Sequence, residues 1–481
     1  MIPSSLPTRP IVLALLLAVS GCSVGPEYRA PALEVPAAFR ATAASGVEAA
    51  PSGAWWRGFK SADLDALIAE ARANSFDIQA AIARVRQADA QVRVAGSPLL
   101  PVADGSAKDS WSRSYQRLGG RGGYNESRSV SIGPSISYEI DFWGRVRAGR
   151  DAAEASALFS RFDQQTVTLT ATTSVASTWF QALAQQDRLD VARRNLGDAE
   201  QILRAIQARQ DAGTVSLLDV SQQAALVAGV RASVPGLQNQ LEQQLNGLGI
   251  LTGHPPEAIT LRPGTLNTLS LPEVTPGVPS ALLARRPDIA AAEAQLRAAN
   301  ANIRVARANF FPQITLTGSG GWQNIALGAL FGPTSLFANA AASVTQTIFD
   351  NGLKRGQYEQ AQARYDELVA DYRKTVVQAF TDVDNAVTAY RFTTEQERLE
   401  RIAVATAQQA ADIARAQVLA GTSDIVVALQ AQTTLFNDLD TLAQVRLARF
   451  QALLSLYKAL GGGWSREDVA APESPLLQDA L

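Results

Sequence analysis

The spacing of hydrophobic residues changes from helical to strictly alternating, and this change occurs twice along the 481-residue chain. Ala-rich segments at 61–97 and 288–309 have apolar residues at helical spacing, and Pro101 and Pro312 come after them. Beyond each proline, apolar residues alternate with small polar ones, which is typical of strands with one apolar face. Each half of the chain is therefore predicted to form a helix followed by strands.

The alternation is clearest between Val130 and Ile140, where even positions are mostly apolar and odd positions are mostly serine. About ten residues is the length that a tilted strand needs to cross a membrane. The second half alternates similarly at 313–317 and 336–348, and a strand near 102–115 is inferred mainly from the repeat. A soluble antiparallel sheet with one solvent-exposed face is the alternative to a membrane-spanning sheet.

A pair of long helices is predicted after the strands in each half. The first helix of the pair covers 144–212 or 352–420, and nearly 70 residues at about 1.5 Å each give roughly 100 Å. The second helix returns to Gly253 or Gly461. Apolar residues form heptad seams along these helices, and such seams require packing partners over their full length. A soluble coiled-coil rod would explain the helices but not the strands between them.

The two halves are copies of one unit. Residues 93–101 resemble 304–312 at an offset of 312 − 101 = 211, and Gly213 matches Gly421 at an offset of 421 − 213 = 208. Matches that keep their register over most of the chain indicate an internal duplication.

The composition, 47% hydrophobic and 18% charged, is that of an ordered chain rather than a disordered one. The net charge of −2 argues against a nucleic-acid binder, which needs a basic face. The chain has one His, one Cys and one Met, and the Met is Met1, so His/Cys metal cages, disulfides and Cys/His catalysis are excluded. We therefore expect no metal site, no catalytic residue and no cofactor other than covalent lipid, and the chain is not expected to be an enzyme.

The single cysteine, Cys22, follows a short apolar run from Ile11 to Val19. Nine apolar residues are too few to cross a bilayer and suit a signal peptide. The run Val19-Ser20-Gly21-Cys22 resembles a bacterial lipobox, which implies that Cys22 carries lipid and begins the mature chain. Ser23 in place of an aspartate implies, by the same resemblance, sorting to the outer membrane.

The predicted parts are a signal peptide (1–21), a lipidated N-terminal segment around the middle, or equator, of the molecule (22–60), a first repeat (61–253), an equatorial crossover (254–287), a second repeat (288–461) and a C-terminal tail (462–481).

Four strands cannot close a membrane barrel, because the smallest known barrels have about eight. An open strand edge cannot face lipid, since its backbone groups would lack hydrogen-bond partners. Assembly with copies of the same chain is therefore required, and a trimer supplies 3 × 4 = 12 strands.

The charge-rich segment Gln116–Ser127 is predicted to be an exterior loop.

Short motifs that occur in a fixed order along the chain carry a family resemblance. They are Trp55-Trp56-Arg57-Gly58-Phe59, Asp141-Phe142-Trp143-Gly144-Arg145, Arg285-Arg286-Pro287-Asp288-Ile289 and Phe310-Phe311-Pro312. Together they resemble the TolC-like outer-membrane factor family, in its lipidated OprM-like (NodT-type) branch, although many members have Leu at the position of Phe142. The resemblance implies a mixed α and β membrane protein, a homotrimer whose 12-stranded outer-membrane β-barrel continues into a long periplasmic α-helical barrel.

The resemblance also implies a function. The protein would be the exit channel of a tripartite efflux system in the outer membrane of a Gram-negative bacterium. It would passively conduct substrates delivered by a periplasmic adaptor and an inner-membrane pump of the RND type. Two alternatives stay open, a channel for type I-like protein secretion and a periplasm-spanning lipoprotein scaffold that does not conduct. A cell-wall hydrolase with paired carboxylates is disfavoured, because the acidic residues are scattered over helical surfaces.

The turns Gly213-Thr214 and Gly421-Thr422 are expected at the periplasmic tip of the helical barrel. Related channels carry acidic rings just after the second turn, and three carboxylates near one axis focus a negative potential. Asp219, after the first turn, matches an acid that helps to hold such tips shut, although its usual partners are replaced in this chain. The simpler interpretation of Asp219 is a carboxylate that favours a helix start.

The positions of the acidic rings are occupied here by Val427 and Gln430, and Asp424 is the nearest acid. We therefore expect the gate to close by packing of Val426, Val427 and Leu429 with a polar ring of Gln430. Asp424 is interpreted either as a displaced acidic ring or as a helix-start carboxylate.

Three further motifs have both structural and functional interpretations. Trp143 lies just past a strand end, where it would serve as a membrane-interface aromatic or as a packing residue at a helix start. Arg285-Arg286 with Asp288 is expected to form a structural ion-pair cluster rather than a binding site. His254, beside two prolines, is expected in a surface turn.

Overall fold

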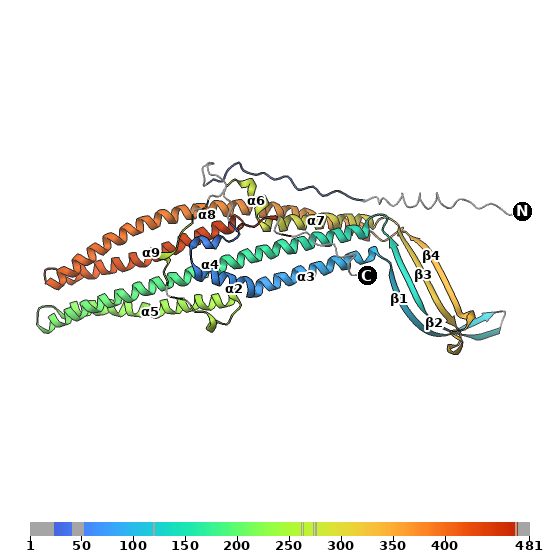
Figure 1. Cartoon of the computed structure of the whole chain (residues 1–481), viewed down its shortest axis with the longest axis horizontal. Helices are drawn as coiled ribbons and strands as arrows, with labels where there is room; N and C mark the ends of the chain where they lie inside the picture. Colours follow the sequence, from blue (N-terminus) through green and yellow to red (C-terminus); the bar gives the residue numbers. More distant parts are fainter. Residues whose placement is uncertain are drawn as a thin grey trace.

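The computed structural model of the chain describes residues 24–40, 52–118, 121–260, 262, 264–272, 274, 277–466 and 469, and Cys22 lies outside these ranges. Figure 1 shows an elongated molecule in which long helices extend away from a four-stranded sheet at one end. Among the helices in the described ranges, none combines the length and apolar character needed to cross a membrane.

Two helices, α2 (Ala62–Asn74) and α3 (Phe76–Gly96), precede the sheet in the first half, and α7 (Pro287–Ala308) precedes it in the second. The single helix predicted at 61–97 is therefore wrong in one respect. Ser75 has a ψ of 127°, outside the helical range, and interrupts the helix between α2 and α3. The prediction for the second half is confirmed.

One antiparallel sheet holds all the described strands, in the order β1-β2-β3-β4. The strands are β1 (Val102–Leu118), β2 (Arg121–Ile140), β3 (Gln313–Asn324) and β4 (Leu336–Thr345). The strand inferred near 102–115 is confirmed. The loop predicted at Gln116–Ser127 is wrong, because β1 and β2 continue through most of that segment and remain paired with each other. The exterior position of this segment stays a prediction.

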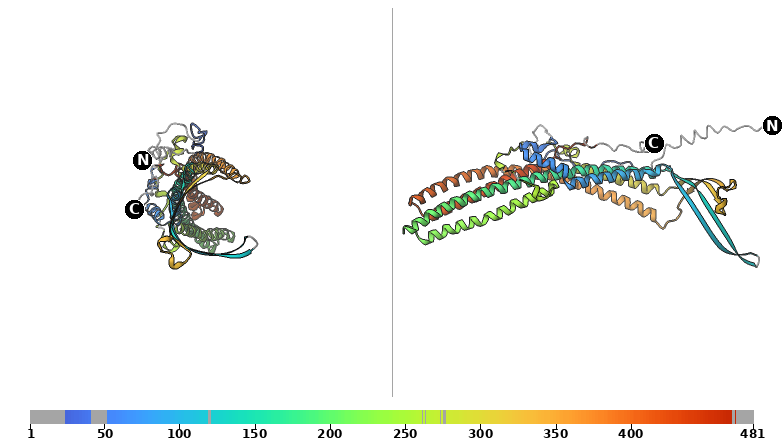
Figure 2. Two further views of the ribbon diagram at one scale, coloured as in Figure 1. Left: turned by 90° about the vertical axis from the view of Figure 1, so that its right-hand side faces the viewer. Right: turned by 60° about the horizontal axis from the view of Figure 1, so that its bottom comes forward.

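The β1–β2 hairpin is longer than the β3–β4 hairpin. β2 pairs with β3 only from Val130, which faces Asn324, to Ile140, which faces Ile314. The part of β1 and β2 between Asp109 and Val130 therefore extends past the end of β3, and Figure 2 shows this part projecting beyond the rest of the sheet.

Two long helical hairpins make up the opposite end of the molecule (Figure 1). They are α4 (Arg145–Asp211) with α5 (Leu217–Thr252), and α8 (Leu353–Ala420) with α9 (Ile425–Ala459). The first helices contain 67 and 68 residues, which corresponds to roughly 100 Å. The long helix pair predicted for each half is confirmed, and the halves share one order of elements.

An aromatic core joins the two halves near mid-length. The short 3-10 helix η1 (Trp55–Phe59) brings Phe59 into full burial between the hairpins. The Phe59 ring centroid lies 5.0 Å from that of Phe180 on α4 and 5.9 Å from that of Phe450 on α9. Burying aromatic rings of this size dominates core energetics, so η1 fixes the first repeat against the second.

The crossover between the halves contains the short helix α6 (Pro279–Arg285). His254 lies in the bend that follows α5 and is partly exposed, as expected, and its side chain also has partners. Its Nε2 lies 2.8 Å from Oε1 of Glu70 and 3.2 Å from Nδ2 of Asn74, so it ties the end of α5 to α2.

The beginning of the predicted C-terminal tail, residues 462–466, packs against the rest of the protein. The Trp464 ring meets Phe162 edge to face at 5.7 Å, and Arg466 pairs with Glu293 on α7. The ordered body of the protein therefore continues at least to Arg466.

A buried carboxylate holds α8 and α9 together. The Glu397 side chain is 2% exposed and accepts hydrogen bonds from Arg446 Nε and Arg449 Nη1, both at 2.9 Å. Arg401, one helical turn further on α8, contributes a third contact at 2.6 Å. Burial alone would raise the pKa of Glu397, but the hydrogen bonds from Arg449 and Arg446 and the charge of Arg401 outweigh it, so the pKa is lowered.

Glu397→Gln is expected to destabilise the folded protein by about 3 kcal/mol at neutral pH, because it leaves buried arginines without their counter-charge. A carboxyl whose pKa is lowered by folding stabilises above its unfolded pKa of 4.5, and this contribution is lost as the pH falls through its folded pKa. The variant should therefore also lose less stability on acidification than the wild type. Thermal unfolding of the purified protein between neutral pH and pH 3 measures both effects.

Glu395→Gln is the matched control, because Glu395 pairs with Arg398 at the surface of the same helix. Its melting temperature should stay close to that of the wild type. Equal melting temperatures for Glu397→Gln and Glu395→Gln would contradict a stabilising role for the buried cluster.

Candidate functional site

The sheet has one apolar and one polar face, set by the pairing register. Even positions of β2, β3 and β4 share a face with odd positions of β1. The apolar face includes Ile132, Ile136, Ile140, Ile314, Leu316 and Val344. The polar face includes Asp104, Ser131, Ser135, Thr315, Ser319 and Asn339. The predicted alternation is confirmed, and such a sheet can separate an apolar phase from water.

The two turns at the far end of the helices have the same geometry. Gly213 and Gly421 both have φ of +75°, a left-handed conformation that glycine adopts without steric cost. Thr214 and Thr422 each donate the backbone N–H, at 2.9 Å, and the hydroxyl to the carbonyl five residues earlier. The turns therefore satisfy carbonyls at the ends of α4 and α8, and we call this region, residues 209–220 and 415–430, the helical tip.

Both carboxylates predicted near the gate act at helix starts. Asp219 Oδ2 accepts from the Ser216 N–H at 2.9 Å, while Ser216 Oγ accepts from the Asp219 N–H at 3.3 Å, which completes a capping box. Asp424 is the N-cap of α9, and its Oδ1 accepts from the Val426 N–H at 3.0 Å. The role of a helix-start carboxylate therefore accounts for the local contacts of both Asp219 and Asp424.

The hairpins pack together just inside the tip. Ile202 and Ile206 of α4, Val418 of α8 and Ile425 of α9 are all buried in one apolar cluster, and Leu429 packs against it. The other predicted gate residues point outward from the single chain. Val426 and Val427 are each 51% exposed, and Gln430 is exposed beside them.

Two arginines at the tip connect the hairpins and were not identified from the sequence. Arg209 Nη1 donates to the Val418 carbonyl at 2.8 Å, where the carbonyls at the end of α8 carry partial negative charge. Arg415 reaches back to α4 and donates to Asp198 and Gln201. For Arg209, its place in the last turn of α4 was the available signal, but this does not reveal which hairpin the side chain contacts.

Trp143 packs in the joint between sheet and helices. Its indole N–H donates to the Pro312 carbonyl at 2.8 Å, and its ring stacks on Phe311 at 4.6 Å. These contacts join the end of β2 to the start of β3, as expected for a packing residue. A role for Trp143 at the membrane interface stays a prediction.

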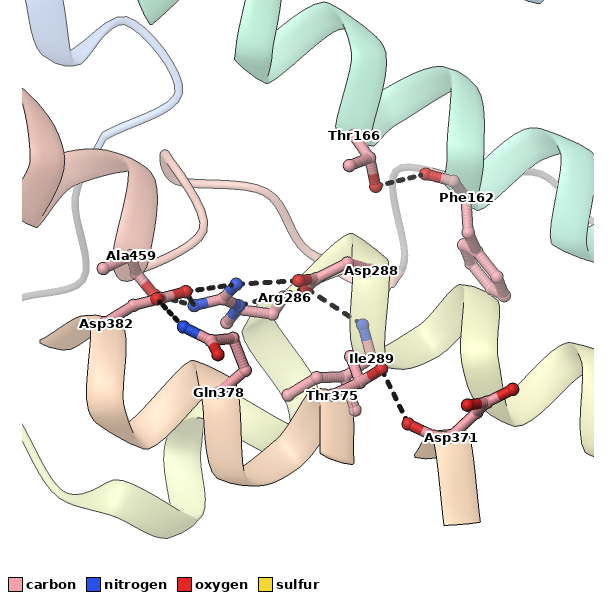
Figure 3. Close-up of polar contacts among 10 residues, drawn as sticks. All are labelled: Phe162, Thr166, Arg286, Asp288, Ile289, Asp371, Thr375, Gln378, Asp382 and Ala459. Atoms are coloured by element: carbon pink, nitrogen blue, oxygen red, sulfur yellow. Dashed lines mark hydrogen bonds and ion pairs between the residues drawn. The ribbon is translucent and has the colours of Figure 1, made fainter. Parts of the chain in front are cut away.

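The Arg286 guanidinium lies at the meeting point of three helices (Figure 3). It donates to both carboxylate oxygens of Asp288, at 3.0 and 2.7 Å, to Asp382 of α8 at 3.1 Å, and to the Ala459 carbonyl of α9. Burial alone would lower the pKa of Arg286, but the hydrogen bonds and charges of Asp288 and Asp382 raise it. The structural ion-pair cluster expected from Arg286 and Asp288 is confirmed.

The N-terminal segment 24–40 runs along α7 toward the sheet. The Tyr28 ring lies 5.4 Å from the Arg297 guanidinium carbon, and a Cβ on Gly25 would lie 2.6 Å from Arg304 Cγ. As the segment is followed back toward residue 24, it therefore approaches the C-terminal end of α7, which leads into β3.

Comparisons with known proteins agree with this geometry. Residues 67–254 and 278–462 match the outer membrane efflux protein family. The chain belongs to this family. It is 37% identical over 466 residues to the pyoverdine export outer membrane protein OpmQ of Pseudomonas aeruginosa, covering 95% of this chain and 97% of that protein. It is 30% identical to the cation efflux system protein CusC of Escherichia coli K12, covering 95% and 100% of the two chains.

Solved structures of efflux channels have the same fold. The outer-membrane channel OprN superposes with a TM-score of 0.85 at 27% identity, covering 92% of this chain and 100% of that one. CusC superposes with a TM-score of 0.82 at 28% identity and the same coverage. The TolC-like fold, the outer-membrane location and the efflux function implied by the sequence motifs are thereby confirmed. Proteins of this family are channels, and this outer membrane efflux protein is one of them.

Proposed function

We propose that three copies of the protein form one water-filled exit duct, with the apolar face of the sheet toward lipid and the polar face toward the lumen. The observation that carries this proposal is the two-faced sheet with two open edges. β1 and β4 lie at those edges, and each pairs with one neighbour within the chain. In a membrane, unpaired backbone groups at both edges would cost several kcal/mol each, so β4 of one copy would pair antiparallel with β1 of the next.

Exposed apolar residues on the long helices support the same assembly. Leu399, Ile402 and Ile413 of α8 are all more than half exposed in the single chain. Long helices gain most of their stability from tertiary packing of an apolar face. Neighbouring copies in the trimer would supply that packing.

The proposed partners are a periplasmic adaptor and an inner-membrane pump of the RND type. Two relatives are named as parts of larger efflux systems. CusC is a cation efflux system protein, and ArpC of Pseudomonas putida is the outer membrane protein of an antibiotic efflux pump. At the helical tip, Leu217 and Leu218 are 69% and 64% exposed. They give the end of the duct an apolar surface for such a partner.

Purified protein is expected to be a homotrimer and to conduct ions in a planar lipid bilayer. Native mass spectrometry in detergent measures the stoichiometry, and single-channel recording measures the conductance. A stable monomer or dimer would contradict the proposed barrel. A trimer that never conducts, including under conditions that open the tip, would favour a periplasm-spanning scaffold instead.

We also propose that Cys22 carries lipid and anchors the mature chain in the outer membrane. The lipobox motivates the proposal, and the course of the N-terminal segment supports it. Gly25 lies beside Arg304, one helical turn before the end of α7, the helix that leads into β3 of the sheet. An acyl chain on Cys22, three residues earlier in the sequence, would enter the membrane leaflet nearest the helices.

Mass spectrometry of the mature N-terminal peptide should find acyl groups on Cys22, with Cys22 as the first residue. Cys22→Ser should weaken anchoring and leave trimer assembly intact, because acylation and barrel insertion are separate membrane signals. A mature chain that starts at another residue, or an unmodified Cys22, would exclude lipidation.

The gate is proposed to close by packing rather than by an acidic cation trap. Asp219 and Asp424 are engaged in helix caps, while Val426, Val427 and Gln430 are exposed where three copies would meet. Arg209 and Arg415 hold the two hairpins of one chain together at the tip.

Channels reconstituted from the wild type should be blocked only weakly by trivalent cations added from the periplasmic side. Gln430→Asp should create block, because a ring of three carboxylates near the axis focuses a negative potential. Single-channel current at increasing cation concentration measures the effect. The control is Asp424→Asn, since asparagine retains the capping ability of aspartate. Strong block of the wild type that disappears in Asp424→Asn would mean that the acidic ring had only moved, and the packing proposal would fail.

A further inference from the structure

The connection between β3 and β4 differs in charge from the rest of the sheet. From Gln313 to Phe349 the sequence contains no Asp, Glu, Lys or Arg, whereas nine charged residues lie between Val102 and Ile140. A loop in contact with water has no need to exclude charge, because charged side chains are well solvated there. The absence of charge over this span therefore calls for an explanation.

The connection, residues 325–335, is held in a defined shape by its own hydrogen bonds. Asn324 Nδ2 donates to Ser335 Oγ at 2.7 Å and to the Ala329 carbonyl at 3.3 Å, and Ser335 Oγ donates to the same carbonyl at 2.9 Å. Ser335 and Leu330 are both buried. We call residues 325–335 the β3–β4 loop.

The outer surface of this loop is apolar. Ile325, Leu327 and Phe331 of the loop and Leu336, the first residue of β4, are between 64% and 75% exposed. The Phe331 ring lies 5.6 Å from that of Trp322. Large exposed apolar groups this close together are unusual on a surface that meets only water.

The register of the sheet shows which way this surface faces. Trp322 lies opposite Ile132, on the apolar face of the sheet, and Phe331 packs on that Trp322 ring. Figure 2 shows the connection on the convex side of the curved sheet, away from the long helices. The apolar surface of the loop is therefore continuous with the face that would meet lipid.

We propose that the β3–β4 loop is a membrane-inserted loop, with Ile325, Leu327 and Phe331 in contact with acyl chains of the outer leaflet. The inference rests on the proposed barrel, in which the end of the sheet away from the helices is the outer end. Lipid is the occupant that fits, because the surface continues the lipid-facing side and the whole hairpin lacks charge. On the neighbouring β1–β2 hairpin, Arg113 and Arg128 lie just beyond Val130, the last residue of β2 that pairs with β3. Charged side chains therefore occur just past the end of β3, as expected where lipid headgroups begin.

Site-directed fluorescence can test the environment of the loop, because the chain has a single native cysteine. Phe331→Cys is made in a Cys22→Ser background, labelled with an environment-sensitive dye, and the full-length trimer is reconstituted into phospholipid vesicles. The dye is then quenched either with iodide in water or with lipids brominated on their acyl chains. At position 331 we expect brominated lipid to remove most of the fluorescence and iodide to remove little.

Two control positions make the outcomes distinguishable. Ile136→Cys reports on the apolar face of β2, and Ser319→Cys reports on the polar face of β3. Quenching by brominated lipid at 136 but not at 331, with iodide quenching at 331, would overturn the loop proposal and leave the barrel intact. Protection of 331 from both quenchers would also overturn it, since a neighbouring copy would then cover the loop. If Ile136→Cys is itself accessible to iodide and not to brominated lipid, the proposed orientation of the sheet fails as well.

A charge introduced into the loop provides a second test. Phe331→Asp is expected to reduce the melting temperature of the trimer in vesicles while changing it little in detergent solution, because a charged side chain is costly in contact with acyl chains. Thr334→Asp, on the same loop, is the matched control and should have a smaller effect in vesicles. Equal effects of the two variants in vesicles would contradict insertion of Phe331.

Discussion

Backbone N–H and C=O groups that enter a bilayer need hydrogen-bond partners, and this requirement governs most of the architecture described above. Within one chain, β2 and β3 are paired on both sides, while β1 and β4 each keep an open side. The open edges explain why a four-stranded sheet belongs to an assembly. Register is equally important, because a shift of one residue between β2 and β3 would exchange their apolar and polar faces.

The internal duplication supplies two copies of each part, and the copies have been adapted to different tasks. The turns at Gly213 and Gly421 are nearly identical in dihedral angle and hydrogen bonding, since each must reverse a long helix in the same way. The two strand hairpins have diverged in charge and in length. One carries cross-strand ion pairs such as Asp109 with Arg128, and the other has no charged residue.

Local patterns predicted the features that depend on neighbouring residues. The alternation from Val130 to Ile140 was sufficient to predict a strand and its two faces, and Gly421 was sufficient to predict a helix end. The Ser216-x-x-Asp219 spacing is also a local capping signal, and it favours the simpler interpretation of Asp219. The family motifs then indicated the channel fold that the comparisons confirmed.

Contacts between distant segments could not be predicted in the same way. The hydrogen bond from Arg209 to the Val418 carbonyl spans 209 residues. Its acceptor is a backbone carbonyl, which every residue has, so the sequence does not indicate which one is used. Glu397 lies among many charged residues on α8, and only the packing of α9 against α8 distinguishes it as buried. Ser75 was overlooked because a single serine within an Ala-rich segment is compatible with a continuous helix.

Because the two strand hairpins differ in length, they differ in how accessible they are to molecules that bind the cell surface. In the assembled protein, three copies of the β1–β2 hairpin would rise above the rest of the sheet, and their exposed aromatic rings, Tyr115 and Tyr124, would be the first part met by antibodies or bacteriophages. Strands in this part pair only with each other, so substitutions there leave the pairing of β2 with β3 unaffected. We therefore expect rapid antigenic drift at the hairpin ends and slow change in the glycine turns at the opposite end of the molecule.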